Sequence, residues 1–324
     1  MRRAGRRAAH RPGPTLSAPP LEPGIVVAGH GRHVWVETPD GRRLICHPRG
    51  KKSQTVVGDQ VLWQATQDEG TIEKVLPRRN LFYRQDEIRT KSFAANLDQV
   101  LILIAAEPEF SESQLCRALI AAEAEKIRPI IALNKSDLAE PFGRAWERMG
   151  VYREMGYQVV PLALKPKAED ISATELDTLI PLMQGKTTLV LGPSGSGKST
   201  LINRLIPNAQ VLTNEISTAL NSGKHTTTST NLYWVDAART TAVIDSPGFQ
   251  EFGLNHIEPM HLASLMPDIK AHAQECKFYN CSHLHEPGCG VINKVKEGAV
   301  PHGISANRYK IYNDLFAELS QTRY

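Results

Sequence analysis

TTLVLGPSGSGKSTLINRLI, residues 187–206, decides the fold of this 324-residue chain. The apolar start of the stretch predicts a strand, its end predicts a helix, and the turn between them reads Gly-x-x-x-x-Gly-Lys-Ser. In such a turn successive backbone N–H groups point at phosphate oxygens, and the helix N-terminus adds the positive end of its dipole. The stretch therefore predicts a strand–loop–helix unit that binds the phosphates of a nucleotide.

The residues of this phosphate loop have separate expected tasks. Lys198 is placed to reach the β- and γ-phosphates and so to act in catalysis, and the Ser199 hydroxyl is placed to ligate Mg²⁺. The predicted phosphate-binding residues are Gly192, Pro193, Ser194, Gly195, Ser196, Gly197, Lys198, Ser199 and Thr200.

The phosphate loop alone does not choose between adenine and guanine. An ATP-driven transporter subunit would also carry a signature like LSGGQ, which this sequence lacks. The apolar run PIIAL leads instead into NKSD, where Asn134, Lys135, Ser136 and Asp137 are the predicted nucleotide-binding residues. The Asp137 carboxylate can accept two hydrogen bonds that guanine donates and adenine does not, which is about 10²- to 10⁴-fold discrimination. Lys135 would lie along the base and Asn134 would tie the two loops together, so the two motifs predict GTP and GDP as ligands.

Two further segments are typical of the parts of a GTPase that respond to the γ-phosphate. In DSPG, Asp245 is placed to hold Mg²⁺ through water, and the Gly248 N–H is placed to meet the γ-phosphate. In GKHTTTST, a threonine among residues 226–228, taken here as Thr227, is expected to bind Mg²⁺ with GTP and to release it after hydrolysis.

The group that orients the attacking water is less clear from the sequence. GTPases of the Ras type carry Gln after DxxG, whereas here Phe249 follows and Gln250 comes one step later. The sequence therefore predicts slow turnover by the chain alone, with His225 as the candidate for orienting water. One alternative is that His225 is an exposed residue without a catalytic role and that the partner supplies the group. A separate alternative is an RNA-binding module whose nucleotide site is only a binding switch with negligible turnover.

The N-terminal part of the chain has a different pattern. Residues 1–24 predict a disordered basic arm, and residues 25–90 alternate apolar and polar positions in short runs, which predicts an OB-type β-barrel. Residues 1–95 carry 17 Lys and Arg against 9 Asp and Glu, which favours contact with RNA over a surface that is merely solvated. The expected phosphate contacts of this basic region are Arg42, Arg43, Arg49, Lys51, Lys52, Arg78 and Arg79.

The remaining residues predict two further domains. Residues 91–254 repeat strand–helix units, which predicts a parallel sheet covered by helices with ligands at the carboxyl ends of its strands. Residues 255–324 predict a mostly helical domain that contains CKFYNCSHLHEPGC. The longest clearly apolar run, residues 100–106, is far shorter than the roughly 20 residues of a membrane span. We therefore expect a cytoplasmic protein without membrane contact.

The Cys/His stretch predicts a metal site. Three thiolates and one imidazole fit a closed tetrahedral Zn²⁺ site, which leaves no open position and is therefore structural. The thiolates are Cys276, Cys281 and Cys289, and the spacing leaves His283 and His285 as alternatives for the fourth ligand. A redox role is the weaker alternative because the chain contains no CxxC pair.

The order of the motifs identifies a resemblance. NKSD precedes the phosphate loop by more than 50 residues, whereas GTPases usually carry it last. This permuted order, with a basic arm and a barrel before it and a Cys/His tail after it, resembles the RsgA (YjeQ) family of bacterial GTPases in small-ribosomal-subunit biogenesis. The resemblance covers nearly the whole chain, but the Ser of the guanine-backing SA box is missing after the strand YQVVPL, where Ala163 stands in.

The resemblance implies a multidomain fold of OB-type barrel, circularly permuted P-loop GTPase domain and C-terminal zinc-binding domain. It implies a protein that binds the small ribosomal subunit and its rRNA, hydrolyses GTP with Mg²⁺ when stimulated by the subunit, and assists late maturation. We expect the chain to be a monomer. It assigns one structural Zn²⁺ to Cys276, Cys281, His283 and Cys289, and it supports His225 because the family carries His in that segment.

Overall fold

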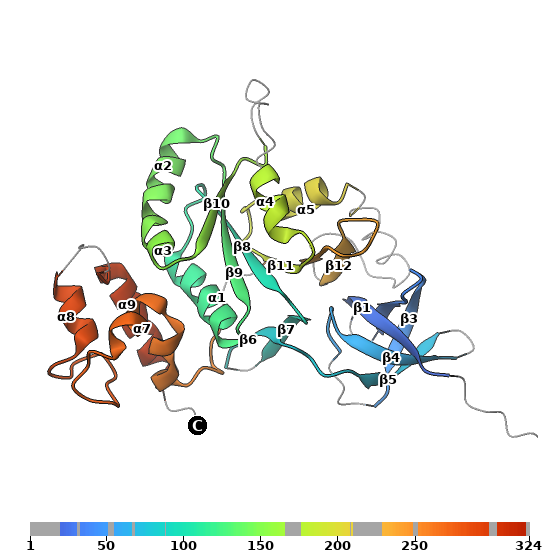
Figure 1. Ribbon diagram of the computed structural model, residues 1–324, viewed down its shortest axis with the longest axis horizontal. Helices are drawn as coiled ribbons and strands as arrows, with labels where there is room; N and C mark the ends of the chain where they lie inside the picture. The colour runs from blue at the N-terminus through green and yellow to red at the C-terminus, as the bar shows by residue number, and fades with distance from the viewer. Residues whose placement is uncertain are drawn as a thin grey trace, which may run out of the picture.

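The computed structural model describes residues 20–30, 33–50, 55–66, 69–87, 89–165, 176–207, 209, 229–248, 252–297 and 303–321. Figure 1 shows three parts in these residues: a barrel, a central sheet with helices, and a C-terminal group of helices. This arrangement confirms the multidomain fold expected from the sequence. The predicted basic arm lies outside the described residues as far as residue 19.

The N-terminal strands close into a barrel. The strands β1 (Glu22–His30), β2 (His33–Glu37), β3 (Arg43–Pro48), β5 (Gly70–Val75) and β4 (Gln60–Ala65) pair in that order, and β4 pairs with β1 again. Alternate side chains of these strands fill the inside, among them Val26, Val36, Val61, Trp63 and Ile72. Closure pairs every strand edge within the barrel, which confirms the expected OB-type fold.

The first strand begins earlier than the sequence indicates. Residues up to 24 were expected to be disordered, but β1 starts at Glu22, which lies opposite Trp63 of β4. The composition of this segment, with Pro23 and Gly24, does not indicate a strand. Pairing with a distant strand supplies the backbone hydrogen bonds that overrule this local preference.

The central sheet has the strand order β10–β9–β8–β11–β13–β12. Its strands are β8 (Gln99–Ala105), β9 (Arg128–Asn134), β10 (Gln158–Leu162), β11 (Thr187–Leu191), β12 (Asn231–Trp234) and β13 (Ala242–Asp245). Neighbours are parallel except β12, which is antiparallel to β13. The parallel strands end at one edge of the sheet, where ligands bind in folds of this kind.

Helices cover both faces of this sheet, as Figure 1 shows. The helices α1 (Glu112–Ala124), α2 (Ala139–Arg148) and α3 (Gly150–Glu154) contribute to one core, and α4 (Leu176–Met183) and α5 (Lys198–Leu205) to the other. Successive residues of β8 alternate between the two cores. Burial on both faces is why β8 is a continuous apolar run in the sequence.

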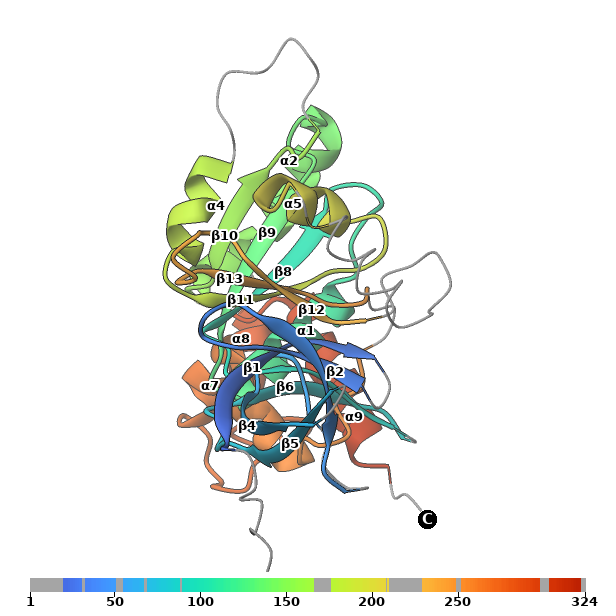
Figure 2. The same cartoon turned by 90° about the vertical axis from the view of Figure 1, so that its right-hand side faces the viewer.

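A hairpin and a strand pairing connect the barrel to the central sheet. Ala28 of β1 pairs with Asn231 of β12, so hydrogen bonds run from one sheet into the other, and Figure 2 shows β1 next to β12. The hairpin β6 (Leu81–Gln85) and β7 (Thr90–Ala95) follows the barrel along the chain. The domain boundary expected after residue 90 therefore falls at the start of β7, inside this hairpin.

The C-terminal part is helical, as expected. It contains the 3₁₀-helix η1 (Pro259–Leu265) and the helices α7 (Pro267–Ala273), α8 (Gly290–Glu297) and α9 (Ala306–Leu319). Helix α9 is capped by the Ser305 hydroxyl, which accepts a hydrogen bond from a backbone N–H of the first turn. These helices pack into the core that also contains α1.

A buried ion pair joins the C-terminal helices to each other and to α1. The Arg308 guanidinium of α9 donates to both carboxylate oxygens of Asp268 at 2.7 and 2.8 Å, and to Cys116 Sγ of α1 at 2.7 Å. The side chains of Arg308 and Asp268 are 3% and 7% exposed. Because both charges are removed from water, each depends on the other for compensation.

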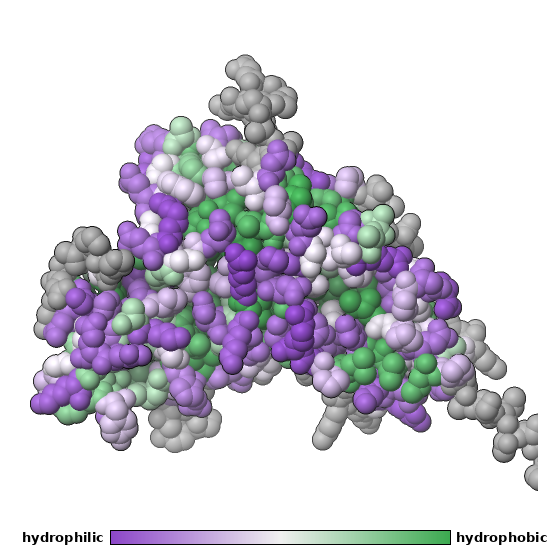
Figure 3. Space-filling view, in the orientation of Figure 1, coloured by the Kyte–Doolittle hydropathy of each residue, from purple (hydrophilic) through white to green (hydrophobic). Residues whose placement is uncertain are grey.

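The surface is mostly polar. Figure 3 shows one face on which hydrophilic side chains predominate and hydrophobic side chains form separate small areas. No helix in the described ranges combines the length and the apolar character that a membrane crossing requires.

Substitution Asp268→Ala will leave the Arg308 guanidinium buried without its partner, and we expect the free energy of unfolding to fall by about 3–5 kcal/mol. Asp314→Ala on α9 is the matched control, because its ion pair with Lys310 is exposed and its loss is worth less than about 0.5 kcal/mol. Urea unfolding followed by circular dichroism measures both variants. Equal stability of the two variants would contradict the structural role of the buried pair.

Candidate nucleotide and metal sites

The sequence motifs of the nucleotide site meet at one cavity of about 1560 Å³. NKSD begins at the end of β9, the phosphate loop follows β11, and DSPG begins at the end of β13. The predicted residues that line the cavity are Asn134, Lys135, Asp137, Pro193, Ser194, Gly195, Gly197, Lys198, Ser199, Thr200 and Gly248. The other predicted residues that the structure describes, Ser136, Gly192, Ser196 and Asp245, lie next to this lining.

The phosphate loop has a backbone conformation that requires glycine. Gly195 has φ of +82° and Gly197 has φ of +102°, both in the left-handed region that favours glycine. A Cβ on Gly197 would lie 2.3 Å from Asn134 Nδ2, so this position also lacks the space for a side chain. The loop leads into α5, whose first residue is Lys198, and the N-terminal N–H groups of a helix at this place can bind an anion.

The side chain of Asn134 joins the base loop to the phosphate loop. Its Nδ2 donates to the Ser196 carbonyl at 2.9 Å, and its Oδ1 accepts from the Leu164 N–H at 3.1 Å. Asn134 is 4% exposed. The sequence predicted its contact with the phosphate loop but not its contact with Leu164. The next residue, Lys135, has φ of +71°, a conformation that costs energy in a residue with a side chain and is held by the surrounding loops.

The backing of the base differs from the sequence expectation. Leu164 and Lys165 line the cavity where Ala163 was expected to stand. Ala163 is buried, and its carbonyl accepts from Arg204 Nη1 at 3.4 Å. The Leu164 N–H donates to Asn134 Oδ1, which ties this segment to the base loop.

An ion pair lies under the phosphate loop. Lys198 Nζ is 2.5 Å from Asp245 Oδ1, and the two side chains are 8% and 10% exposed. Burial raises the pKa of the Asp245 carboxyl, and the Lys198 ammonium opposes that rise. The two residues expected at the phosphates and at Mg²⁺ therefore compensate each other's charge in this structure.

The γ-phosphate side of the site is described in part. A Cβ on Gly248 would lie 3.5 Å from the Gly192 carbonyl, so DSPG adjoins the phosphate loop. His225, Thr226–Thr228 (with Thr227), Phe249 and Gln250 lie outside the described residues.

The cavity has a further wall that no motif predicted. It is formed by the hairpin β6–β7, by α1, by the residues after DSPG and by α9. The lining residues of this wall are Arg84, Asp86, Glu87, Gln114, Arg117, Phe252, Gly253, Asn255, Glu318 and Gln321. They have no common local pattern in the sequence, since only the packing of separate elements brings them together.

The expected RNA-contacting arginines of the barrel region are all in ion pairs. Arg43 Nε lies 2.6 Å from Glu37 Oε2, and Arg78 binds both carboxylate oxygens of the fully buried Asp59 at 2.7 and 2.8 Å. These two arginines are mainly structural. The more exposed ones, which keep free surface for a polyanion, are Arg42, Arg49 and Arg79. Lys51 and Lys52 lie outside the described residues.

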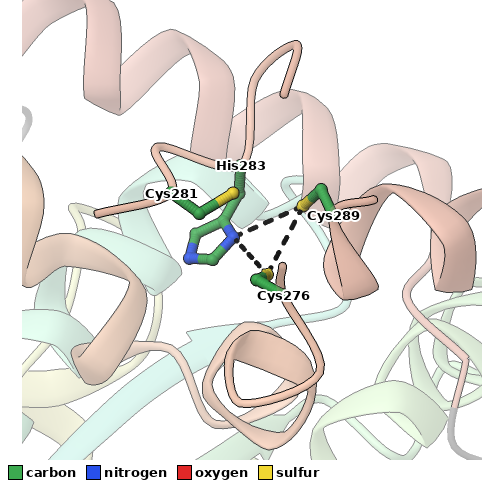
Figure 4. Close-up of side chains that lie close together, drawn as sticks. All are labelled: Cys276, Cys281, His283 and Cys289. Carbon is green, nitrogen blue, oxygen red and sulfur yellow. Dashed lines mark hydrogen bonds between the residues drawn. The ribbon is translucent and has the colours of Figure 1, made fainter. Parts of the chain in front are cut away.

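Four side chains of the C-terminal part form a cluster that could hold a metal ion. The ligand atoms of Cys276, Cys281, His283 and Cys289 lie within 4.8 Å of one another. Cys276 Sγ is 3.7 Å from Cys289 Sγ, and His283 Nδ1 is 3.4 and 3.5 Å from these two sulfurs, as Figure 4 shows. Tetrahedral bonds of about 2.3 Å to sulfur and 2.0–2.1 Å to nitrogen place sulfurs about 3.8 Å apart and sulfur and nitrogen about 3.5 Å apart. The geometry selects His283, since His285 is exposed outside the cluster.

The loop that carries these ligands is fixed by its own hydrogen bonds. The Glu286 carboxylate accepts from the backbone N–H groups of Ser282, Leu284 and His285. The Tyr309 hydroxyl of α9 donates to the His283 carbonyl at 2.7 Å. His283 has φ of +61°, and these bonds hold it in that uncommon conformation.

The protonation of the cluster follows from burial. Burial raises the pKa of the Cys281 thiol to about 12 and also raises the pKa of Cys289. Burial lowers the pKa of His283, which favours the neutral imidazole that a metal needs. Binding of a metal ion therefore has to release the thiol protons.

Comparison with known proteins finds relatives of the whole chain. Residues 75–255 match the family described as RsgA GTPase. The small ribosomal subunit biogenesis GTPase RsgA of Variovorax paradoxus (strain S110) is 70% identical over 324 residues, which are 100% of both chains. The protein of the same name from Paraburkholderia xenovorans (strain LB400) is 48% identical over 92% of this chain and 93% of the relative.

Solved structures show the same likeness. YloQ, described as a circularly permuted GTPase, is 28% identical and has a TM-score of 0.68 over 96% of this chain and 100% of its own. YjeQ from Thermotoga maritima is 29% identical and has a TM-score of 0.69 over 94% of this chain and 100% of its own.

We expect Gly197→Ala to weaken GDP binding by at least about tenfold, because the new Cβ collides with Asn134 and the left-handed φ is strained. Gly143→Ala on α2 is the control, since no atom lies within 4 Å of its Cβ and its φ is ordinary. Isothermal titration with GDP measures both. Parental affinity in Gly197→Ala would show that the loop tolerates a side chain.

We expect His283→Ala to lose the bound metal and to destabilise the C-terminal helices, because three thiolates alone leave the site open. His285→Ala should keep one metal ion per chain, since His285 lies outside the cluster. Elemental analysis of the purified variants, with thermal melting, makes the comparison. Metal loss in His285→Ala alone would reverse the assignment.

Proposed function

The chain belongs to the RsgA GTPase family and hydrolyses GTP, and on that premise we propose that it binds the small ribosomal subunit and is stimulated by it. In this proposal hydrolysis assists a late step in the maturation of the subunit. The names of the relatives at 70% and 48% identity support the small subunit as the partner, and its rRNA is the part that we propose the chain contacts.

The observation that carries the proposal is that the base loop and the phosphate loop line the same cavity. Asp137 and the loop from Pro193 to Thr200 line this cavity. In this proposal the Asp137 carboxylate accepts from two guanine donors and the loop binds the phosphates. Adenine lacks the adjacent pair of donors, N1–H and an exocyclic amine, that would bind both oxygens of this carboxylate. GTP and GDP are therefore the proposed ligands.

The residues around the phosphate loop have separate proposed roles in the reaction. Lys198 would turn from Asp245 to the β- and γ-phosphates, and Ser199, Asp245 and Thr227 would hold Mg²⁺. Mg²⁺ supplies charge neutralisation at the transferred phosphoryl group. The Gly248 N–H is proposed to meet the γ-phosphate, in keeping with its place beside the phosphate loop.

His225 is the proposed water-orienting residue. Phe249 occupies the place of the usual Gln and its side chain can neither donate to nor accept from water. The imidazole of His225 can do both near neutral pH. Its sequence position among the threonines of residues 226–228 supports a place near the γ-phosphate.

The metal is proposed to be one structural Zn²⁺. Three thiolates and one imidazole at tetrahedral spacing are the ligands that Zn²⁺ prefers, and four protein ligands leave no open position for water or substrate. The ion would link Cys276, Cys281 and His283 of the loop to Cys289, directly before α8.

We also propose that the protein acts as a monomer. The exposed large hydrophobic side chains in the described ranges are Leu21, Ile180, Met260, Phe278 and Tyr279. Apart from the neighbours Phe278 and Tyr279, they come from separate elements, which does not favour a self-association surface.

We expect purified small ribosomal subunits to raise GTP turnover at least about tenfold, with ATP turnover unchanged.

We expect His225→Ala to keep GTP affinity and to lose about 10²-fold or more of the stimulated rate, because a water-orienting group acts in the transition state. Phosphate release in single and multiple turnover measures both. The control is His261→Ala, an exposed residue on η1.

Two results would contradict this proposal in different ways. A rate that does not change with subunits would remove the proposed partner but leave the GTPase. A His225→Ala variant with full stimulated turnover would remove only the role of that residue.

A further inference from the structure

Separate parts of the molecule meet at Arg117, which lies on α1 in the wall of the nucleotide cavity. Its Nη1 donates to the Phe252 carbonyl at 3.3 Å and to Glu318 Oε1 of α9 at 2.9 Å. Its Nη2 donates to the second carboxylate oxygen of Glu318. The Arg117 side chain is only 15% exposed, so these contacts replace most of its hydration.

Phe252 lies close to DSPG along the chain. It comes four positions after Gly248, and four residues span at most about 14 Å. Gly248 adjoins the phosphate loop, beside the carbonyl of Gly192. The place of Phe252 therefore limits where the Gly248 N–H can lie.

The hairpin β6–β7 holds Phe252 from the other side. The centroid of the Phe252 ring lies 5.7 Å from that of the Phe82 ring and 6.0 Å from that of the Phe93 ring, with which it is nearly parallel. Phe252 is 1% exposed, so this aromatic cluster is dry. Aromatic packing holds the Phe252 side chain, and the hydrogen bond from Arg117 holds the Phe252 carbonyl.

The backbone after Phe252 continues this attachment. The Gln85 N–H donates to the Gly253 carbonyl at 3.0 Å, and the Asn255 N–H donates to the Gln85 carbonyl at 2.9 Å. A Cβ on Gly253 would lie 2.5 Å from the Gln85 carbonyl oxygen, so only glycine permits this approach. The segment Phe252–Asn255 is thus joined to the hairpin by one parallel β-bridge between Gln85 and Leu254, and Arg117 joins the segment to α1 and α9.

We propose that Arg117 is a positioning residue for GTP binding and hydrolysis, aimed by Glu318 at the Phe252 carbonyl. This inference rests on the role proposed above for Gly248. By holding Phe252, Arg117 keeps Gly248 within reach of the γ-phosphate. GDP has no γ-phosphate, so the contact favours GTP over GDP. By linkage, bound GTP favours the arrangement of α9 in which Glu318 reaches Arg117.

The alternative is an ion pair that only joins α1 to α9. A pair of that kind would stabilise the fold equally with either nucleotide. The two ideas differ in the ratio of GTP to GDP affinity, which a purely structural pair does not change.

The test compares the affinities for GDP and for the slowly hydrolysed analogue GTPγS by isothermal titration, together with the unstimulated kcat and KM. We expect Arg117→Ala to weaken GTPγS binding about tenfold and to change GDP binding less than twofold. Arg117→Lys should restore part of the lost GTPγS affinity, since an ammonium can donate to an acceptor but lacks the planar fork with which the guanidinium binds Glu318 and the Phe252 carbonyl together. Glu318→Gln should weaken GTPγS binding about threefold, because Arg117 keeps its N–H donors but loses the charged partner that orients them.

A variant in which the two charges are exchanged distinguishes a positioning role of Arg117 from a purely structural one. The double variant Arg117→Glu, Glu318→Arg restores an ion pair between α1 and α9 but removes the donor at position 117. We expect its preference for GTPγS to stay as low as in Arg117→Ala. Recovery of the parental preference would overturn the proposal, as would equal losses for both nucleotides in Arg117→Ala.

Two controls accompany these variants. Arg144→Ala removes an exposed arginine that pairs within α2 and should leave both affinities unchanged. Gly248→Ala tests the premise separately: selective loss of GTPγS binding supports the role of Gly248 at the γ-phosphate. If Gly248→Ala shows no selective loss, the premise fails, and the Arg117 proposal fails with it. Thermal melting of each variant confirms that the fold is intact.

Discussion

The buried amide of Asn134 is the interaction on which the nucleotide site depends. It donates to the carbonyl of Ser196 and accepts from the N–H of Leu164, so one side chain sets the distance between the base loop, the phosphate loop and the segment after β10. A guanine nucleotide spans these loops, and its recognition requires that they keep one spacing. The closeness of Gly197 to this amide makes glycine necessary in the phosphate loop for a reason beyond its φ.

The permuted chain order changes connections and leaves the site intact. NKSD precedes the phosphate loop in the sequence, yet the parallel strands β9, β8, β11 and β13 bring all three motifs to one edge of the sheet. What the permutation alters is the route of the chain after DSPG. It passes along the hairpin β6–β7 at Phe252 and Leu254 and enters the C-terminal helical part, whose loop carries the Cys/His cluster. The part next to the γ-phosphate is thereby attached to two other domains.

Buried arginines join these domains. Arg308 binds Asp268 and Cys116, and Arg117 binds Glu318 and the Phe252 carbonyl, so α9 contacts the GTPase domain through both of its ends. The loop with the Cys/His cluster is also attached to α9, because the Tyr309 hydroxyl donates to the His283 carbonyl. A charge that is buried among exact partners resists small displacements, because each shift leaves part of its hydrogen bonding unmade.

The sequence by itself determined the GTPase domain, the loops that carry its chemistry, the barrel and the four metal-binding positions, with His283 and His285 left as alternatives. These features depend on local demands: apolar periodicity, glycine at positive φ and short ligand spacing. Only the tertiary structure decided between the two histidines, replaced Ala163 by Leu164 at the cavity, placed Arg43 and Arg78 in ion pairs and brought Arg117 to Phe252. Each of these depends on which distant side chains come to share one buried space, and no local pattern records that.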